Sequence, residues 1–279
     1  MGGSRPVKII FFGTPDYVLP ILTSLHKEYV TGPGKSPIVA VVTQSPKPVG
    51  RKQVLTYSPI DKWAHTRNIP VIYDLDKVPM ADLGIVASYG RIIPKFLISN
   101  FKFQILNIHP SLLPKYRGAS PIQSAIAAGE IETGVTIIKM DEKMDHGPVV
   151  SSFKEEILPT DTGETLRTRL FEKSAQFLID LIPNYIKGKI KPKEQDHNKA
   201  TYTKIVTKQD GFIDLEKDDP AEIERKLRAY TPWPGIWTKI NDKRLKILEF
   251  KNEPITVQLE GKTPVSWKQF KEAYPSTRL

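Results

Sequence analysis

Residues 105–147 read ILNIHPSLLPKYRGASPIQSAIAAGEIETGVTIIKMDEKMDHG and hold two short apolar runs separated by a helical stretch. The runs at residues 105–108 and 135–140 have the length and apolar character of buried β-strands. The stretch between them begins after Ser120, a common helix N-cap, and stops at Gly129, a common glycine position beyond a helix end. A strand, a helix and a second strand in this order predict an α/β fold.

The same alternation extends over the rest of the N-terminal part. Apolar runs at residues 8–12, 38–43, 70–72 and 83–88 predict further buried strands, and residues 17–27, 57–67 and 165–186 have the pattern of helices. We therefore predict a Rossmann-like α/β domain with a mostly parallel sheet over residues 1–186. In such sheets, ligands bind beyond the carboxyl ends of the strands, where Gly13, Tyr89 and His109 fall.

Three polar side chains, an amide, an imidazole and a carboxylate, lie in or shortly after the apolar runs at residues 105–108 and 135–140. Asn107 and His109 are two positions apart, so both point to one face of a strand, and Asp145 comes after the second run. An imidazole exchanges protons near neutral pH and an amide N–H stabilises a developing oxyanion, so the trio suits acyl transfer. Taken singly, a histidine before proline or an aspartate before His-Gly is more often a turn residue.

The overall composition narrows the function classes. The chain has no cysteine, which excludes disulfides, thiolate metal sites and cysteine nucleophiles. With 41 Lys and Arg against 31 Asp and Glu, the net charge is +10, which favours a polyanionic partner such as nucleic acid without requiring one. No apolar run reaches the roughly 18 residues of a membrane helix, and residues 1–8 lack the apolar core of a signal peptide, so we expect a cytoplasmic protein.

Four further segments, in chain order, resemble one enzyme family. They are IIFFGTPDYVLPIL at residues 9–22, TQSPKPVGRKQVLTYSP at 43–59, SYGRIIP at 88–94 and AYTPWPGIW at 229–237. Together with the first stretch they resemble the folate-dependent formyltransferases, most closely the members that act on tRNA. The resemblance implies transfer of a formyl group from 10-formyltetrahydrofolate to the α-amino group of methionyl initiator tRNA.

The resemblance also assigns roles to the trio, because Asn107, His109 and Asp145 match the positions of the family's catalytic residues. It implies that His109 carries the proton, that Asn107 donates to the oxyanion and that Asp145 orients the imidazole. The family pattern does not need the neighbouring His146, which we interpret as a loop residue. The sequence has no His-x₃-His pair and no thiolate, so we predict no metal.

Two segments match the family's folate site. The resemblance implies that backbone groups of one segment mainly line the pterin pocket, and this segment consists of Ser88, Tyr89, Gly90, Arg91, Ile92 and Ile93. The second is a loop where donor and acceptor meet, consisting of Ser111, Leu112, Leu113 and Pro114. Because only X-Pro bonds adopt the cis form cheaply, the Leu113–Pro114 bond is a candidate cis peptide.

Basic residues in two regions favour a tRNA partner. The loop at residues 44–58 carries Lys47, Arg51 and Lys52, and a lysine-rich segment at residues 187–208, interpreted as a linker, carries Lys189, Lys191 and Lys193. Residues 209–279 resemble the family's OB-like β domain, which contacts tRNA, but they are too few for a complete five-stranded barrel. We therefore predict a small, shortened C-terminal β domain.

Two other functions remain open from the sequence. Formyltransferases that act on small amines, such as amino sugars, share the fold and the trio, and a salt-dependent affinity for tRNA would separate them from the tRNA enzymes. A catalytically inactive, basic RNA-binding protein would instead bind tRNA without turnover. The family resemblance further suggests a monomer, and the lack of a long apolar run predicts no membrane association.

Overall fold

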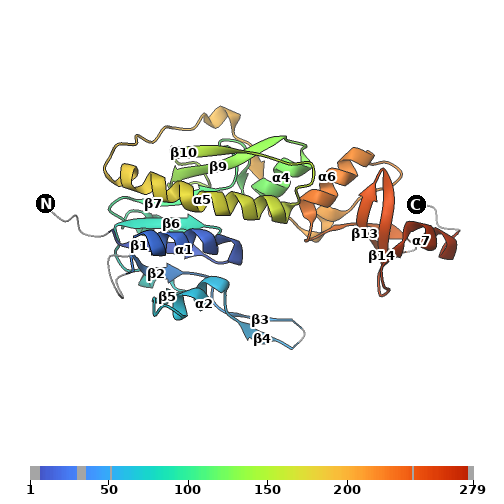
Figure 1. Cartoon of the computed structure of the whole chain (residues 1–279), viewed down its shortest axis with the longest axis horizontal. Coiled ribbons are helices and arrows are strands. Elements are labelled where there is room, and N and C mark those ends of the chain that lie inside the picture. The colour runs from blue at the N-terminus through green and yellow to red at the C-terminus, as the bar shows by residue number, and fades with distance from the viewer. Residues whose placement is uncertain (1–6, 30–35, 51, 241, 276–279) are drawn as a thin grey trace. The chain divides into compact units, whose positions relative to one another are not determined.

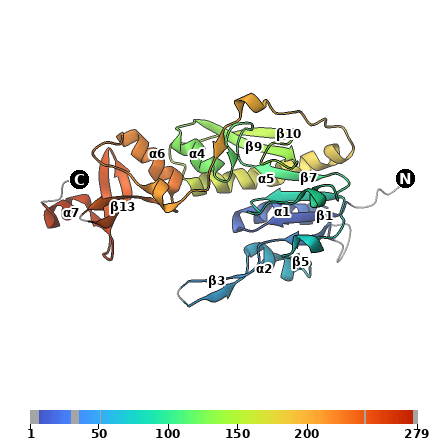
Figure 2. The same ribbon diagram turned by 180° about the vertical axis from the view of Figure 1, so that it is seen from behind.

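The computed structural model describes residues 7–29, 36–50, 52–240 and 242–275 (Figures 1 and 2). Contacts within the chain define two compact units, each made of three segments. Unit 1 consists of Met1–Arg117, Gly134–Lys154 and Thr168–Ala200, and unit 2 consists of Gly118–Thr133, Glu155–Arg167 and Thr201–Leu279. These units are assembled from separate segments, so they do not test the domain boundaries predicted at residues 186 and 208, which stay predictions.

Unit 1 is built on a sheet with the strand order β10-β9-β7-β6-β1-β2-β5. Its strands are β1 (Ile9–Gly13), β2 (Ile38–Val42), β5 (Val71–Ile72), β6 (Leu83–Ala87), β7 (Ile105–His109), β9 (Glu132–Lys139) and β10 (Val149–Glu156). The strands β5, β2, β1, β6 and β7 are parallel to their neighbours, whereas β9 is antiparallel to β7. This arrangement confirms the predicted Rossmann-like, mostly parallel sheet.

Helices α1 (Leu19–Glu28), α2 (Pro59–His65), α3 (Lys95–Ile98) and most of α5 (Gly163–Ile186) belong to unit 1, with the 3₁₀ helices η1 (Asp16–Val18), η2 (Leu75–Lys77) and η3 (His197–Lys199). Helix α2 begins where the hydroxyl of Ser58 accepts a hydrogen bond from the N–H of Asp61 at 3.0 Å. Pro20 lies in the first turn of α1. A backbone N–H there would have no acceptor within the helix, so a proline is tolerated at this position.

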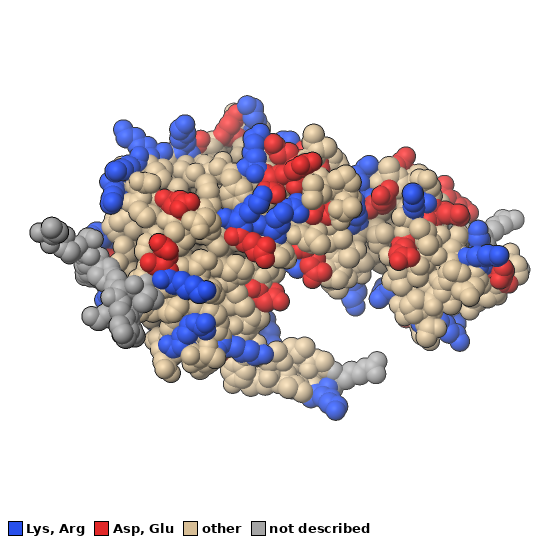
Figure 3. All heavy atoms as spheres, in the orientation of Figure 1, with Lys and Arg blue, Asp and Glu red and all other residues tan. Residues whose placement is uncertain are grey.

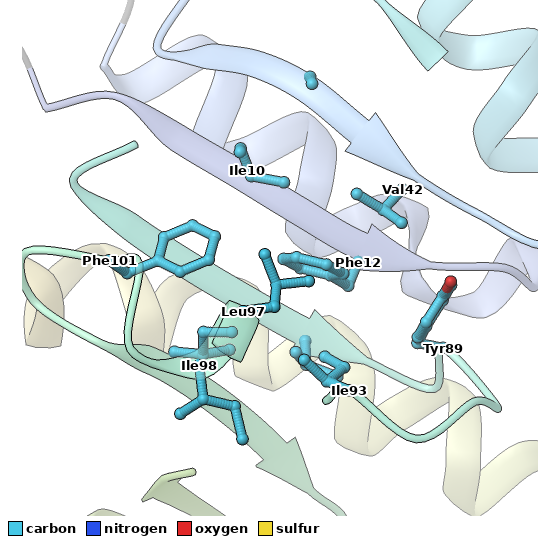
Figure 4. Packing of buried hydrophobic residues seen from close by; sticks show 11 residues of the cluster. Ile10, Phe12, Val42, Tyr89, Ile93, Leu97, Ile98 and Phe101 are labelled. Atoms are coloured by element: carbon cyan, nitrogen blue, oxygen red, sulfur yellow. The ribbon is translucent and has the colours of Figure 1, made fainter. Parts of the chain in front are cut away.

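The middle of the sheet is buried because its strands are apolar on both faces, as a parallel sheet requires. The ring of Phe12 lies edge-to-face with Tyr89, at 5.9 Å between centroids, and with Phe101, at 6.2 Å. Figure 4 shows these rings in one cluster with Ile93 and Leu97. The packing fixes the loop that follows β6, which is one of the two predicted folate-binding segments.

The predicted loop after β2 contains a β-hairpin of β3 (Lys47–Val49) and β4 (Val54–Thr56), which Figure 1 shows extending from the rest of unit 1. The side chains of Val49, Val54 and Leu55 are each more than half exposed. Strands of three residues, one of them beginning Lys-Pro, have no alternating pattern from which a hairpin could be predicted.

Unit 2 contains an antiparallel sheet with the order β12-β13-β14-β15. Its elements are α4 (Pro121–Ala127), η4 (Lys208–Gly211), α6 (Pro220–Tyr230), β12 (Ile236–Ile240), β13 (Lys243–Lys251), β14 (Glu253–Leu259), β15 (Val265–Ser266) and α7 (Trp267–Ala273). The short strands β8 (Arg117–Gly118) and β11 (Tyr202–Thr203) lie outside both sheets. Ile236, Leu245, Val257 and Trp267 are buried in one core, and this sheet confirms the predicted small C-terminal β domain.

A capping box at Thr207 and Asp210 starts η4 in unit 2. The carboxylate of Asp210 accepts hydrogen bonds from the hydroxyl and the backbone N–H of Thr207, both at 2.7 Å, and Lys204 lies 3.0 Å away. These contacts, the Thr207 hydroxyl first, lower the pKa of Asp210 to about 2.

We expect Asp210→Ala to lower the free energy of unfolding by about 1 kcal/mol at pH 7. Because the folded-state pKa is depressed, this stabilisation is complete above the ordinary carboxyl pKa of 3.8 and disappears as the pH falls toward 2. Urea denaturation at pH 7, 4 and 3 measures the difference, with the exposed Glu224→Ala of α6 as control. A loss that is independent of pH would contradict the assignment to the Asp210 carboxylate.

Candidate functional site

The three side chains predicted as catalytic meet in unit 1. Asn107 and His109 lie on alternate positions of β7, and Asp145 lies in the loop after β9. The amide Nδ2 of Asn107 donates to Oδ1 of Asp145 at 3.1 Å, and Nδ1 of His109 lies 3.5 Å from the other oxygen, Oδ2. One carboxylate therefore contacts both the amide and the imidazole.

A loop that doubles back brings Asp145 to this position. Because β9 is antiparallel to β7, its last residue, Lys139, pairs with Leu106 near the start of β7. The chain then returns past β9, and it passes so close that a Cβ on Gly147 would lie 1.9 Å from the carbonyl oxygen of Lys139. Asp145 has a φ of 48°, in the left-handed region that few non-glycine residues occupy. The trio thus converges through this loop rather than through neighbouring strand ends.

The ring of His109 has two distinct nitrogens. Nε2 lies 2.9 Å from the carbonyl oxygen of Tyr116, and because a carbonyl only accepts, Nε2 must carry a hydrogen. Nδ1, which faces Asp145, is therefore the nitrogen that can gain or lose a proton. The side chains of His109 and Asp145 are only 5% and 12% exposed, so these two groups are largely shielded from water, whereas Asn107 is partly buried.

The segment predicted as a linker contributes a residue that sequence reasoning missed. Nε2 of Gln195 donates to the carbonyl oxygens of Asp145, at 2.9 Å, and Gly147, at 2.8 Å. The backbones of Lys193 and Val149 exchange two hydrogen bonds, which hold this segment against β10. A lysine-rich stretch without apolar periodicity has no feature that predicts such packing, so no sequence signal could have identified Gln195.

The second imidazole, His146, contacts groups outside the trio. Its Nδ1 lies 2.7 Å from Oδ2 of Asp141, and its ring stacks on that of His197 at 3.9 Å between centroids. The Nδ1 atom of His197 accepts a hydrogen bond of 2.8 Å from the guanidinium of Arg117. His146 therefore contacts Asp141 and His197, and its interpretation as a loop residue outside the chemistry stays a prediction.

The predicted folate loop is a turn held by internal contacts. The hydroxyl of Ser111 donates to the carbonyl oxygen of Lys115 at 2.7 Å, so this side chain stabilises the turn itself. The hydroxyl of Thr136 donates to the carbonyl of Ser111 at 2.7 Å and accepts from the N–H of Leu113 at 3.1 Å. The Leu113–Pro114 bond is cis, as the sequence suggested.

The predicted pterin-pocket segment, residues 88–93, divides between core and surface. Tyr89 and Ile93 are buried in the cluster of Figure 4, whereas Gly90, Arg91 and Ile92 are exposed. Burial raises the pKa of the Tyr89 hydroxyl. The exposed middle of the segment is the part that a ligand can contact.

Hydrogen bonds join the loops after three parallel strands. The carbonyl oxygen of Tyr89 accepts from the hydroxyl of Thr14, after β1, at 3.1 Å and from Nε2 of Gln44, after β2, at 3.2 Å. Ser88 precedes this junction with a φ of 47°. Thr14 and Asp16 are residue types that often cap helices and they precede α1, but Thr14 bonds to Tyr89 and neither η1 nor α1 has a side-chain cap hydrogen bond.

The predicted tRNA-binding residues form two separate groups. Lys47, which contacts Gln44 at 3.3 Å, and Lys52 are exposed on the hairpin, whereas Arg51 lies outside the described residues. Lys189, Lys191 and Lys193 are also exposed, on a segment that Figures 1 and 2 place at a different edge of unit 1 from the hairpin. On the face seen in Figure 3, basic and acidic side chains are interspersed.

The described part of the chain holds neither a cluster of metal-binding side chains nor a helix able to cross a membrane. It contains no group of three or more His, Asp or Glu side chains arranged to hold a metal ion. Among its helices, none combines the length and apolarity that crossing a membrane requires.

Comparisons with known proteins identify relatives over nearly the whole chain. Residues 7–182 match the formyl transferase family, and residues 205–258 match the formyl transferase C-terminal domain. A methionyl-tRNA formyltransferase of Myxococcus xanthus is 38% identical over 255 residues, which cover 88% of this chain and 78% of the relative.

Two solved structures share the fold. A sugar 3N-formyl transferase, solved in the presence of dTDP and 5-N-formyl-THF, aligns with a TM-score of 0.66 at 23% identity, covering 94% of this chain and 98% of that one. A methionyl-tRNA formyltransferase from Clostridium thermocellum aligns with a TM-score of 0.61 at 18% identity, covering 93% and 99%. The chain, with its matching sequence and its matching fold, belongs to the formyl transferase family.

Proposed function

We propose that this protein transfers a formyl group from 10-formyltetrahydrofolate to the α-amino group of methionyl initiator tRNA. The observation that carries the proposal is the carboxylate of Asp145, which contacts both the amide of Asn107 and the imidazole of His109. The 38% identity with a methionyl-tRNA formyltransferase supports the choice of acceptor. A monomeric state stays a prediction from the family resemblance, and a cytoplasmic location stays a prediction from the composition.

Each member of the trio has a role that its contacts support. When bound, 10-formyltetrahydrofolate supplies the formyl group. The acceptor's amine nitrogen forms a bond to the formyl carbon, the bond from that carbon to N10 breaks, and the proton lost by the amine ends on N10. Nδ1 of His109 is placed to carry this proton, because the carbonyl of Tyr116 engages Nε2.

Asn107 and Asp145 prepare the site for the charge that develops on the formyl oxygen. An amide nitrogen carries two hydrogens, and the contact with Asp145 uses one of them. The second N–H of Asn107 is the donor that we assign to the formyl oxygen, since a donor that is already fixed in place stabilises such a charge strongly. Asp145 holds this amide and the imidazole in one arrangement.

Residues of two segments would hold the folate. The exposed backbone of Gly90, Arg91 and Ile92 follows β6, and the turn at Leu112 and Leu113 follows β7. Both segments come directly after parallel strands, at the edge of the sheet where ligands of such folds bind. The internal hydrogen bonds of both segments support a preformed site, which binds a ligand without the cost of ordering a loop.

An amino sugar is the second candidate acceptor, because a sugar 3N-formyl transferase shares the fold with a TM-score of 0.66. The deciding experiment measures formyl transfer from 10-formyltetrahydrofolate to methionyl initiator tRNA, methionyl elongator tRNA and a dTDP-linked amino sugar. Turnover on the initiator tRNA alone supports the proposal. Turnover on the sugar alone would identify the amino sugar, and not the tRNA, as the acceptor. Binding of tRNA without turnover on any acceptor would indicate an inactive RNA-binding protein.

The hairpin lysines provide a test of tRNA binding. We expect the double variant Lys47→Ala, Lys52→Ala to bind tRNA more weakly and to reduce the slope of log affinity against log salt by about 1 to 2, one contact per lysine. At saturating tRNA, kcat should stay unchanged. Lys77→Ala, which removes a similarly exposed lysine of unit 1, is the control. An unchanged salt slope would mean that the hairpin lysines do not contact the tRNA phosphates.

A further inference from the structure

We infer that Gln195 is a positioning residue for the formyl transfer reaction, acting through the backbone of Asp145. The inference rests on the proposed function, and it adds a residue that lies 50 positions beyond Asp145 in the chain. Gln195 is 7% exposed, and its amide forms hydrogen bonds on both ends. It would touch neither donor nor acceptor, because its contacts are the site loop and Arg117.

Arg117 fixes the orientation of the Gln195 amide. Its guanidinium, which is 1% exposed, approaches Oε1 of Gln195 with its Nη2 atom at 2.7 Å and its Nε atom at 3.3 Å. A guanidinium only donates, so the group that faces it must be the amide oxygen. The NH₂ group of Gln195 must then point to the other side, where both available hydrogens meet carbonyl oxygens.

Those carbonyls belong to Asp145 and Gly147, so two hydrogen bonds from Gln195 clamp the loop on either side of His146. This loop contains the left-handed backbone of Asp145 and the close passage of Gly147 past Lys139. A non-glycine residue in the left-handed region is strained and persists only where its surroundings hold it. Gln195 supplies that restraint in a buried place where water does not compete.

The restraint matters for the chemistry because the Asp145 carboxylate must reach two groups at once. Its oxygens contact Asn107 at 3.1 Å and His109 at 3.5 Å, and a rotation of the backbone would move both oxygens together. Catalytic groups displaced by a fraction of an ångström lose much of their effect. Loss of Gln195 should therefore slow the chemical step more than it weakens substrate binding.

Gln195→Glu is the most selective test. The carboxylate has nearly the same shape and still accepts from Arg117, but in its ionised form it has no hydrogen to donate to the carbonyls of Asp145 and Gly147. We expect kcat to fall about 10- to 100-fold, while KM for methionyl initiator tRNA and for 10-formyltetrahydrofolate stays within about twofold. Gln176→Glu, the same change at an exposed position of α5, is the control and should leave kcat unchanged.

A double-mutant cycle with Asp145→Asn separates positioning from general destabilisation. If Gln195 acts through Asp145, then Gln195→Glu lowers kcat much less in the Asp145→Asn background than in the wild type. Equal fold losses in both backgrounds would overturn the inference, because they would mean that Gln195 acts independently of Asp145. Undiminished kcat in Gln195→Glu, with a wild-type melting temperature, would overturn it as well.

The remaining outcomes are also decisive. If Gln195→Glu does not fold, Gln195→Ala removes the same donors without adding a carboxylate, and it should show the same selective fall in kcat. Misfolding of both variants would assign Gln195 a purely structural role and overturn the inference. If the wild-type protein has no turnover on any acceptor, the proposed function and this inference fall together. If the wild type and Gln195→Glu are both fully active, only the inference is overturned.

Discussion

Asp145→Asn is expected to lower kcat about 10³-fold, which is the largest effect that we predict for a single residue. The substitution keeps the shape of the side chain but removes the negative charge between Asn107 and His109. An asparagine also has an NH₂ donor in place of one carboxylate oxygen, so the two positions that contact Asn107 and His109 would no longer both be acceptors. Formyl transfer to methionyl initiator tRNA at saturating substrates measures the change.

The control for this variant lies in the same loop. Glu142→Gln also replaces a carboxylate with an amide, but Glu142 pairs with Lys95 at 2.6 Å on the surface, where both side chains are more than half exposed. We expect its kcat to stay within about twofold of the wild type, since exposed ion pairs contribute little. Similar losses in both variants would mean that the charge of the loop matters and that the contacts of Asp145 do not.

His109→Ala is expected to lower kcat by at least about 10²-fold and to leave the affinity for tRNA nearly unchanged. The reason is that alanine removes the only imidazole in contact with Asp145 among the described residues, and with it the nitrogen assigned to proton transfer. The side chain is 5% exposed, so it has little surface with which to bind tRNA. Steady-state kinetics and a tRNA binding assay measure the two quantities separately.

His146→Ala is the matched control, because it removes an imidazole one residue from Asp145 that contacts Asp141 and His197 instead of the trio. We expect its kcat to stay within about threefold of the wild type. If His146→Ala lost activity and His109→Ala retained it, the proton carrier would be His146. Wild-type turnover in His109→Ala would refute the catalytic assignment of His109.

Elements with strong local signals could be predicted from the sequence. The apolar runs that became β1, β2, β6 and β7 are each too short for a helix and are bounded by polar or turn residues. The pairing of Asn107 with His109 follows from the two-residue period of a strand. The positions of the three site residues in or after two apolar runs also predict the approach of Asn107 and His109 to Asp145, but the loop that produces it depends on the antiparallel direction of β9, which no local pattern encodes.

Other features depend on tertiary contacts and have no local signature. Thr14 satisfies the expected pattern of a helix cap, yet its hydroxyl bonds to Tyr89, 75 residues away. Gln195 lies in a stretch whose lysines suggest a solvated linker, and only the folded chain brings its amide into hydrogen-bond contact with the carbonyl oxygen of Asp145. In both cases, a polar side chain finds its partner through the packing of distant segments, so single-sequence reasoning has nothing to detect.

The distance of Gln195 along the chain has a consequence for synthesis. Ribosomes make the protein from the N-terminus, so Asn107, His109 and Asp145 all leave the exit tunnel well before the amide that clamps their loop. A nascent chain arrested between residues 145 and 195 would carry every residue assigned to the chemistry and still lack the two hydrogen bonds from Gln195. The arrangement of the trio on the nascent chain should therefore be completed only when the segment after α5 has emerged.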